Sequence, residues 1–589
     1  MIAVHVTHEA VEKMGGIGAV IDGLVTSRCY RDAFERTILI GPLLMTDRPA
    51  AERLGRGGKV IYSSLDNIDT GGWAGRFRPI ERSYDVGIIY GLRRFPVPDT
   101  DLEVEVEVLL VDVFRYNRDR LNLFKADLYN RFFIPSDRFE NIWEFEQYVR
   151  LSEPACEAMH AIGCLGSAGD PVVVVAHEYM GVPTALKAML NGRSAVRTIF
   201  YAHEVASARR IVEKHDGHDL MFYNLLEAGQ REAKSLEDFF PEITRYFKHP
   251  LVKAARYCDA VFAVGELVGR EMRFLAPGNR ALPVEVVYNG VPADRQTLPE
   301  RQDHRARMKQ YASNLFGFEP DYIFTHVARP VLSKGIWRDL RVMHELAGFL
   351  QRQAKSAVYF MLGTLAGQRR TKDVLQMERV YGWPVHHSLG YPDLCNGEET
   401  VGEMFEVFNR HHDTVRAVLV NQFGWQRRLC GLRMPEGTGI ADIRRGTDVE
   451  FGLSVYEPFG ISQLEPLAFG AICVVSSVCG CLGLARHCAG GELPANILVG
   501  DMVQARGPTT SAKAARLARA DREAVEAAEG KRLAEELARR LPRDEADVAR
   551  LQDSGWQLGQ RLGWEHVVEE YFLPAVRRAR EEDQLTGPE

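Results

Sequence analysis

Residues 454–477 read SVYEPFGISQLEPLAFGAICVVSS and hold the parts of one strand–helix–strand unit. The stretch begins as the end of a strand, passes through a Pro/Gly turn and a short helix, and returns at Gly470 to an apolar strand. The helix is predicted to begin near Gly460, where unpaired backbone N–H groups favour an anion. Two carboxylates, Glu457 and Glu465, lie in the turn and on the helix. Because the chain has 80 acidic residues, such a pair also arises by chance, and other segments must support a site here.

Length and composition are those of a globular protein with more than one domain. A chain of 589 residues exceeds what one hydrophobic core usually supports. Its net charge of −7 disfavours a nucleic-acid partner bound through overall charge. No apolar run reaches the length of about 18 residues that a membrane span needs, and the N-terminus lacks the features of a signal peptide. We therefore expect a cytoplasmic protein without a membrane span.

The cysteines predict no metal site. None of the ten belongs to a CxxC pair, and the cluster Cys479, Cys481 and Cys488 lacks a second half with zinc-site spacing. Buried free thiols are the expected reading.

Short apolar runs alternate with longer amphipathic segments along most of the chain. The runs that predict strands are residues 2–6, 37–40, 104–113, 172–176, 198–201, 260–264, 284–287, 323–327, 358–362, 449–453, 472–475 and 497–499. Most are continuously apolar, as buried parallel strands are. The alternating LEVEVEV within residues 102–108 predicts instead a half-exposed strand near an edge.

This pattern predicts the α/β class with two doubly wound, Rossmann-like domains. The boundary is placed after VEVVYNGVP, so that residues 1–292 and 293–560 form the two domains. Ligands of such sheets bind at the carboxyl ends of the strands, and two such domains facing each other would make a deep cleft. Residues 561–589 carry an apolar helical face and are expected to dock back onto the body, with Pro574 kinking or breaking the helix.

Three stretches interrupt the alternation. Residues 129–148 are dense in aromatics, which suits a core or a sugar-stacking surface. Residues 364–446 are too long for one βα unit and are expected to carry insertions. Residues 503–551 are charged and Ala-rich without a substantial apolar face, so solvated helices are predicted there.

A glycine-rich loop follows the first strand. In HEAVEKMGGIGAV, Gly15 and Gly16 let the backbone approach a ligand before a helix begins, and Lys13 adds a charge suited to phosphate. A Rossmann NAD site is disfavoured because the G-x-G-x-x-G spacing is absent. The second strand also ends in Gly-Pro without an acidic residue.

Two later strands end in His-Glu. His177 and Glu178 follow VVVVA, and His203 and Glu204 follow TIFYA. One such histidine alone would suit a helix cap, but two at equivalent strand ends predict a ligand site. No HExxH motif is present, and a metal pair is not predicted.

Two basic residues follow the first strand of the second half. HVARPVLSKGIW places Arg329 and Lys334 there, where a guanidinium fork and a compact ammonium suit a diphosphate.

The segments EKMGGIGAV, YAHE, YNGVP, ARPVLSKG and YEPFGISQLEPLAFGAICVVSS occur in the order found in retaining glycosyltransferases of the GT-B fold. Within that group the chain resembles the glycogen and starch synthases, in separated blocks over residues 1–475. K-x-G-G-I and LIGP are similar to the animal and fungal type. Glu465 and SSVCGCLG depart from the bacterial ADP-glucose synthases, which leaves UDP and ADP open as the nucleotide.

The resemblance implies roles for the candidate residues. It assigns Lys13, Gly15 and Gly16 to the donor phosphate and the acceptor side, His177 and Glu178 to the cleft, His203 to the transferred sugar and Asn289 to the donor. In the second half it assigns Arg329 and Lys334 to the leaving diphosphate, Glu457 to the donor sugar, Gly460 and Ile461 to the phosphates and Glu465 to the ribose.

The resemblance further implies transfer of a glucosyl unit from a nucleotide-diphosphate sugar to an α-glucan, with no metal or other cofactor. A retaining transferase with a small-molecule or lipid acceptor, and a non-catalytic sugar-nucleotide- or glucan-binding protein, stay open as alternatives. An oligomer is also left open. A metal-dependent GT-A enzyme would need a DxD motif, and DTD at residues 99–101 falls in a predicted loop.

Overall fold

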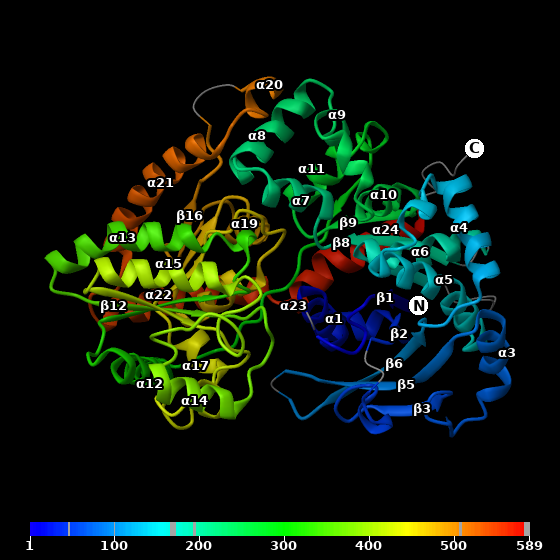
Figure 1. Cartoon of the computed structure of the whole chain (residues 1–589), viewed down its shortest axis with the longest axis horizontal. Coiled ribbons are helices and arrows are strands. Elements are labelled where there is room, and N and C mark those ends of the chain that lie inside the picture. The colour runs from blue at the N-terminus through cyan, green and yellow to red at the C-terminus, as the bar shows by residue number, and fades with distance from the viewer. Residues whose placement is uncertain are drawn as a thin grey trace. The chain divides into compact units, whose positions relative to one another are not determined.

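The computed structural model describes residues 1–13, 15–44, 47–98, 100–164, 172–191, 196–505 and 509–581. The chain forms two compact units (Figure 1). Unit 1 comprises Met1–Ala208, Ala233–Gly290 and Trp564–Glu589, and unit 2 comprises Arg209–Glu232 and Val291–Gly563. The predicted division did not foresee Arg209–Glu232, which it had placed in the first domain. This segment belongs to unit 2 through Asp219, whose carboxylate accepts two hydrogen bonds from the buried Arg338, at 2.6 and 2.8 Å.

The sheet of unit 1 has ten strands within the described ranges, in the order β10-β9-β8-β7-β1-β2-β6-β5-β3-β4. Their bounds are β1 Ile2–Val6, β2 Arg36–Pro42, β3 Lys59–Ser63, β4 Ile68–Asp69, β5 Gly87–Pro96, β6 Glu103–Asp112, β7 Val172–His177, β8 Val196–Ala202, β9 Ala260–Ala263 and β10 Glu285–Val286. Every strand predicted for the first half is present, and β3, β4 and β5 were missed. The strands from β10 to β6 are parallel, whereas β5 runs antiparallel to β6.

Strand β6, which the alternation predicted to be half-exposed near an edge, is an interior strand of the sheet that is half-exposed at its beginning. It pairs with β2 only over residues 107–111, whereas all of it pairs with β5. Its first four residues therefore have a strand on one side only, and Glu103 and Glu105 are exposed there. The alternation records this local half-exposure rather than an edge of the whole sheet.

The helices of unit 1 cover the sheet. Their bounds are α1 Gly16–Thr26, α2 Arg28–Ala33, α3 Ala74–Tyr84, α4 Arg118–Phe132, α5 Trp143–Ala161, α6 Glu178–Leu190, α7 Ala206–Lys214 (whose last residues enter unit 2), α9 Leu236–Phe239, α10 Lys248–Lys253 and α11 Glu266–Phe274. The aromatic stretch 129–148 is mostly core, because Phe132, Phe139, Phe145 and Tyr148 are buried; Tyr129, Phe133 and Trp143 are exposed.

The C-terminal segment of unit 1 consists of α23 (Trp564–Val567), a π-helical turn at Val568–Phe572 and α24 (Leu573–Glu581). Pro574 was expected to kink or break this helix, and it does not break it, because helix continues on both sides. The widened π turn ends at Phe572, two residues before the proline, and such turns accommodate a missing backbone donor. Trp564 packs on Gly23 and Gly290, where an added Cβ would lie within 2.0 and 2.6 Å of its ring. In Figure 1 the red α24 lies beside β8.

The sheet of unit 2 is wholly parallel within the described residues, in the order β13-β12-β11-β14-β15-β16. Its bounds are β11 Tyr322–Val327, β12 Ala357–Leu362, β13 Val415–Val420, β14 Val449–Gly452, β15 Ile472–Ser476 and β16 Ile497–Gly500. The five strands predicted for the second half are all present. The missed strand, β13, lies inside the stretch 364–446, so this stretch extends the sheet as well as carrying insertions.

Helices cover both faces of this sheet (Figure 1). Their bounds are α8 His218–Arg231, α12 Leu298–Phe316, α13 Ile336–Arg352, α14 Thr371–Tyr381, α15 Glu398–His411, α16 Arg427–Cys430, α17 Ile440–Arg445, α18 Ile461–Leu464, α19 Cys481–Ala489, α20 Ser511–Ala514, α21 Arg519–Arg540 and α22 Glu545–Leu562. Because successive strand residues face opposite sides, Phe324 packs in the core with α13, α15 and α21, and Ile323 packs in the core with α12.

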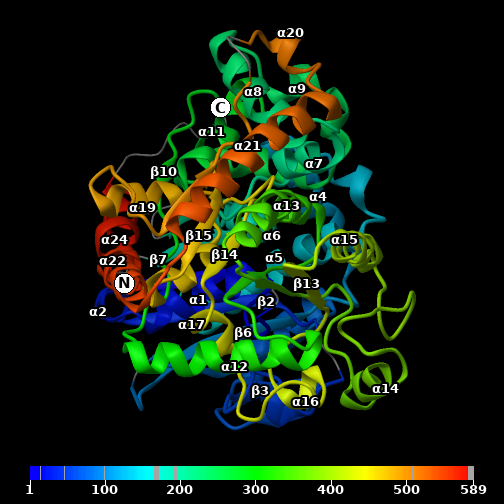
Figure 2. The ribbon, with the colours of Figure 1, turned by 90° about the vertical axis from the view of Figure 1, so that its left-hand side faces the viewer.

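The charged stretch 503–551 is not the solvated segment that was predicted. Helix α21 packs along α13, as Figure 2 shows, and buries Leu533, Ala534 and Leu537 in the core of unit 2. These apolar positions form a narrow stripe with small residues, which a charged and Ala-rich background conceals in the sequence.

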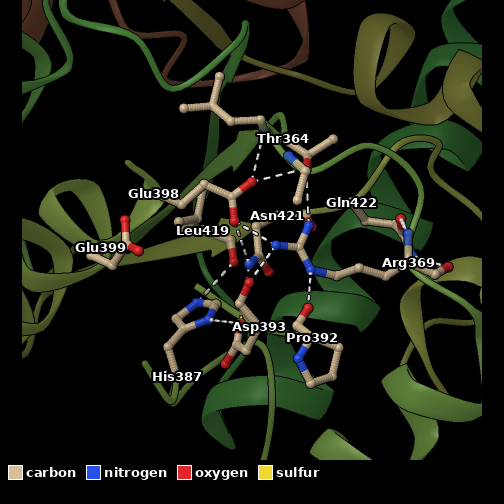
Figure 3. Close-up of polar contacts among 12 residues, drawn as sticks. Thr364, Arg369, His387, Pro392, Asp393, Glu398, Glu399, Leu419, Asn421 and Gln422 are labelled. Atoms are coloured by element: carbon tan, nitrogen blue, oxygen red, sulfur yellow. Dashed lines mark hydrogen bonds and ion pairs between the residues drawn. The ribbon is translucent and has the colours of Figure 1, made fainter. Parts of the chain in front are cut away.

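The loop between β12 and α15 is fastened by one buried arginine (Figure 3). Every N–H of the Arg369 guanidinium is used: Nε donates to Pro392 O, Nη1 to Thr364 Oγ1 and Asn421 O, and Nη2 to Asp393 O and Glu398 Oε2. Asn421 follows β13, so this network connects the loop after β12 to the end of the neighbouring strand.

No helix in the described part of the chain is long and apolar enough to cross a membrane.

Candidate functional site

In unit 2, polar side chains meet at the carboxyl ends of the neighbouring strands β11 and β14. Lys334 ends the 3-10 turn Leu332–Lys334 after β11, and its Nζ lies 2.5 Å from Glu457 Oε2 in the turn after β14. The same oxygen accepts from Gln463 Nε2 at 2.9 Å and from Ser454 Oγ at 3.2 Å. The structure thus brings together two predicted residues and adds two that the sequence reading missed.

Glu457 is ionised at neutral pH. Burial by itself raises the pKa of this carboxyl, but the Lys334 ammonium and the hydrogen bonds from Gln463 and Ser454 outweigh it, so the pKa lies below its usual value. The side chains of Lys334 and Glu457 are 19% and 11% exposed, so the pair is largely desolvated yet still open to a ligand. An anion arriving here would find a preformed cation.

The turn that holds Glu457 requires glycine at its end. Gly460 has φ 88° and ψ 63°, and a Cβ there would lie 2.6 Å from Cys479 Sγ. The segment 479–481 also braces the turn, because Gly480 N donates to Glu457 O at 3.1 Å and Cys481 N to Phe459 O at 2.8 Å. Ile461 begins α18, which is only four residues long before the 3-10 turn Glu465–Phe469.

Glu465 and Arg329 lie in different electrostatic settings. Glu465 Oε2 forms an ion pair with Arg444 Nη2 at 2.7 Å, and Arg444 Nη1 also donates to Glu450 Oε1 at 3.1 Å. Arg444 was not among the predicted site residues. Arg329 is exposed, and its guanidinium has no partner within the described residues.

In unit 1, the predicted glycine loop already holds an anion of the protein itself. Gly15 N and Gly18 N both donate to Glu9 Oε2, at 2.9 and 2.8 Å, and the Glu9 side chain is 2% exposed. This carboxylate occupies the beginning of α1, where we expected a ligand phosphate. Gly16 is exposed, and Lys13 forms a long, half-exposed ion pair with Asp22 at 3.4 Å.

The structure brings His177 and His203 together. His177 ends β7, His203 follows the adjacent β8, and His177 Nδ1 is hydrogen-bonded to His203 Nε2 at 2.8 Å. The rings stack with centroids 5.1 Å apart at 9°. The predicted Asn289 is buried, with its Oδ1 3.5 Å from the hydroxyl of Tyr201.

Two residues that the sequence reading missed extend this pair. His5 Nδ1 is hydrogen-bonded to His177 Nε2 at 2.8 Å, and His5 Nε2 to the Tyr30 hydroxyl at 2.7 Å. Burial lowers the pKa of His5 and of His203 to about 3, and lowers that of His177 well below its ordinary value, so all three rings are neutral at physiological pH. A histidine within the apolar run 2–6 was the available signal.

Glu178 combines backbone strain with a buried carboxyl. Its φ is +61°, a left-handed conformation that non-glycine residues rarely adopt. Its Oε1 accepts from Glu204 N at 2.6 Å, which fastens the turn that carries His203. Burial, and then the nearby Glu204, raise the pKa of Glu178 well above its usual value, which favours the protonated carboxyl.

Within the described residues, no group of three or more His, Cys, Asp or Glu could hold a metal ion. Asp99, the first residue of the DTD sequence, lies outside those residues. Cys479 and Cys481 are buried free thiols with their Sγ atoms 3.3 Å apart.

No protein-family model and no curated protein matches the chain. Solved structures do. The catalytic domain of starch synthase IV from Arabidopsis thaliana, bound to ADP and acarbose, aligns with a TM-score of 0.52 at 14% identity, over 98% of this chain and 99% of that one. Sucrose-phosphate synthase from Thermosynechococcus elongatus gives 0.48 at 13% identity, over 98% of each chain. A UDP-forming α,α-trehalose-phosphate synthase from Burkholderia xenovorans gives 0.47 at 12%, over 99% of each.

At these identities the likeness shows the fold, and of these three only the starch synthase has a TM-score above 0.5. It agrees with the architecture that the sequence predicted: an α/β chain with two parallel-sheet domains. The chain has the GT-B fold of glycosyltransferases.

Proposed function

We propose that the protein is a retaining glycosyltransferase that moves a glucosyl unit from a nucleotide-diphosphate sugar to an α-glucan. The observation that carries the proposal is the Lys334–Glu457 pair at the carboxyl ends of β11 and β14. It supplies a cation for a leaving phosphate and an ionised carboxylate for sugar hydroxyls within one desolvated cluster.

The chemistry requires charge stabilisation on the donor. Breaking the bond between the sugar and the diphosphate develops negative charge on the departing oxygens. Lys334 would neutralise it, joined by the exposed guanidinium of Arg329, because cations aimed at a developing charge need little reorganisation. Glu457 would hold the sugar, while Gly460 and Ile461 would contact the phosphates. Glu465 would contact the ribose.

Retention follows when the acceptor hydroxyl attacks from the face that the diphosphate leaves. The leaving phosphate then takes the proton of the acceptor hydroxyl, so no separate base is required. His203 would contact the transferred sugar. In unit 1, Lys13, Gly16 and Asn289 would contact the nucleotide-sugar donor. The Gly15 amide would reach a ligand only by giving up its bond to Glu9.

The acceptor is the least constrained part of the proposal. The segments shared with glycogen and starch synthases favour an α-glucan, and the starch synthase domain of the same fold was bound to ADP and acarbose. Two further similar structures are a sucrose-phosphate synthase and a trehalose-phosphate synthase, so a small phosphorylated sugar is the acceptor to test against it.

The test is incubation with UDP-glucose or ADP-glucose and either glycogen or glucose 6-phosphate, reading nucleoside diphosphate release and transfer of labelled glucose. We expect elongation of glycogen, and a loss of roughly 10²–10³-fold in kcat for Lys334→Met or Glu457→Gln. The matched control is Lys355→Met, which removes the partly exposed pair with Asp321 before β12 and should leave the rate unchanged. Full activity of both site variants would overturn the assignment. Transfer only to glucose 6-phosphate would replace the α-glucan by a small phosphorylated sugar as the acceptor.

A further inference from the structure

A line of hydrogen bonds runs through the core of unit 1 and ends at His203. It begins at Thr37 Oγ1 on β2, which lies 3.2 Å from the hydroxyl of Tyr30 on α2. It continues through His5 on β1 at 2.7 Å, His177 at the end of β7 at 2.8 Å, and His203 at 2.8 Å. Tyr30, His5 and His177 are 1%, 0% and 0% exposed.

The rings of this line must order their protons together. A neutral imidazole has one N–H donor and one bare nitrogen. Each of His5 and His177 uses both ring nitrogens within the line, so each must accept on one side and donate on the other. Only two arrangements satisfy every contact: all protons directed toward His203, or all directed toward Tyr30.

Tyr30 selects the first arrangement. A phenol is a far stronger acid than a neutral imidazole, and an imidazole nitrogen is a far stronger base than a phenol oxygen, so the hydroxyl donates to His5 Nε2. Burial raises the pKa of Tyr30, which keeps this hydroxyl protonated, and Thr37 can donate to the phenol oxygen. Phe572 of the C-terminal segment packs 6.0 Å from the Tyr30 ring, so the far end of the line is enclosed by apolar side chains.

We infer that Tyr30, His5 and His177 are positioning residues that hold His203 as a neutral ring with its proton on Nδ1. Nε2 of His203 accepts from His177, and Nδ1 has no partner within the described residues, on a side chain that is only partly buried. His203 therefore offers an N–H donor to a ligand oxygen, and its one bare nitrogen, Nε2, is occupied by the hydrogen bond from His177, so it is not available as a base. This deepens the proposed function, on which it rests for the ligand: the oxygen is a hydroxyl of the transferred sugar.

The tautomer can be measured without any activity. In protein labelled with ¹⁵N in histidine rings, long-range ¹H–¹⁵N correlation distinguishes protonated from bare nitrogens, and the His203→Gln variant assigns the signals of His203. We expect a protonated Nδ1 and a bare Nε2 for His203 in the wild-type protein. A bare Nδ1 would overturn the inference, whatever the protein catalyses.

Two isosteric variants test whether Tyr30 sets the order. Tyr30→Phe removes the donor to His5 Nε2, and we expect the His203 Nδ1 signal to move toward the bare-nitrogen position. Tyr201→Phe is the matched control. Tyr201 is buried with its ring centroid 4.4 Å from that of His203, but its hydroxyl donates to Val287 O, outside the line. An unchanged His203 spectrum in Tyr30→Phe, or an equal change in Tyr201→Phe, would overturn the role of Tyr30.

The kinetic consequence applies if the transferase assay succeeds. Tyr30→Phe should lower kcat/KM by about tenfold, the size of one weakened hydrogen bond in an otherwise intact site. An intact tautomer pattern without glucosyl transfer would contradict the proposed function and leave the assignment of His203 standing.

Discussion

Each unit has a buried polar cluster at the carboxyl ends of its strands, and the two clusters are built differently. In unit 2, Arg369 donates from every N–H to the loops after β12 and β13, and its side chain is 1% exposed (Figure 3). In unit 1, the line from Tyr30 to His203 uses each group once on either side and ends on a ring that is only partly buried.

The difference separates holding a loop from offering a group to a ligand. A cluster in which every donor is used leaves nothing for a ligand, and its free energy goes into the fold. A line with an open last member keeps one donor in reserve. The clusters should therefore respond differently to substitution and to pH.

The largest effect is expected from Arg369→Leu. It leaves the Glu398 carboxylate buried without its cation, and breaking such a pair lowers the free energy of unfolding by roughly 3–5 kcal/mol. Urea unfolding measures it. Arg370→Ala is the matched control, because the neighbouring Arg370 is 59% exposed in its pair with Asp373 and should cost less than about 1 kcal/mol. Equal losses in the two variants would contradict the comparison.

The histidine line should lower the free energy of unfolding of the protein in mild acid. In the unfolded chain these rings protonate below pH 6.5, whereas in the folded state His5 and His203 protonate only near pH 3, so stability falls as the pH drops from 6.5. At pH 5 this amounts to about 2 kcal/mol for the fully buried His5. Between pH 6.5 and 5 the His5→Gln variant should take up one proton fewer on unfolding than the wild-type protein. The variant His386→Gln, at an exposed site, should take up as many protons as the wild-type protein.

The Asp393 carboxylate of the Arg369 network should stay ionised over the same pH range. Burial by itself raises the pKa of Asp393, but hydrogen bonds from His387, Ser388 and Asn421 outweigh it and hold the pKa below 3.8. Its contribution is therefore kept until the pH falls below that value. Hydrogen exchange in the segment 364–397, which includes α14, should show equal protection at pH 5 and pH 7 once it is corrected for intrinsic rates. Loosening at pH 5 would blur the distinction between the clusters.

Glu178 gives a smaller effect with the opposite sign. Its carboxyl keeps its proton to a higher pH in the folded state than in the unfolded chain, where it ionises around the ordinary pKa of 4.5, so it lowers stability as the pH rises above 4.5. Glu178→Gln keeps an acceptor for Glu204 N and cannot ionise. We expect it to raise the free energy of unfolding at pH 8, with little change at pH 4. A loss of stability at pH 8 would show that the carboxyl is ionised in place.

The smallest stability change is expected at the Arg444–Glu465 pair, where Glu465 is 29% exposed. Glu465→Gln should alter the free energy of unfolding by less than about 1 kcal/mol. If Glu465 holds the ribose, the variant should still weaken nucleoside diphosphate binding in a calorimetric titration. Unchanged binding would remove Glu465 from the donor site while leaving Lys334 and Glu457 in it.

Much of the fold was predictable because buried parallel strands are continuously apolar. All the predicted strands are present, including β1, β7 and β15. Strand β13, with the sequence VRAVLV, has the same pattern and was overlooked inside a stretch read as an insertion. Helix α21 was misread because its buried stripe is narrow and combines two leucines with Gly530, Ala534 and the charged Arg522 and Glu526.

Strand ends were the informative part of the sequence for the site, since the carboxyl ends of parallel strands meet at one edge. This placed Lys334 beside Glu457 and His177 beside His203. Local pattern could not show which groups would already be taken. The amide of Gly15 donates to the carboxylate of Glu9, and the carboxylate of Glu465 is paired with Arg444.

The sequence by itself therefore determined the α/β class, the positions of most strands along the chain and the residues at their ends, because burial and backbone geometry act over short stretches. Only the tertiary structure decided how polar groups are paired. The direction of the hydrogen bonds that reach His203 depends on Tyr30 and His5, which lie on other elements, and hydrogen bonding over a few ångströms is set by packing rather than by neighbours in the chain.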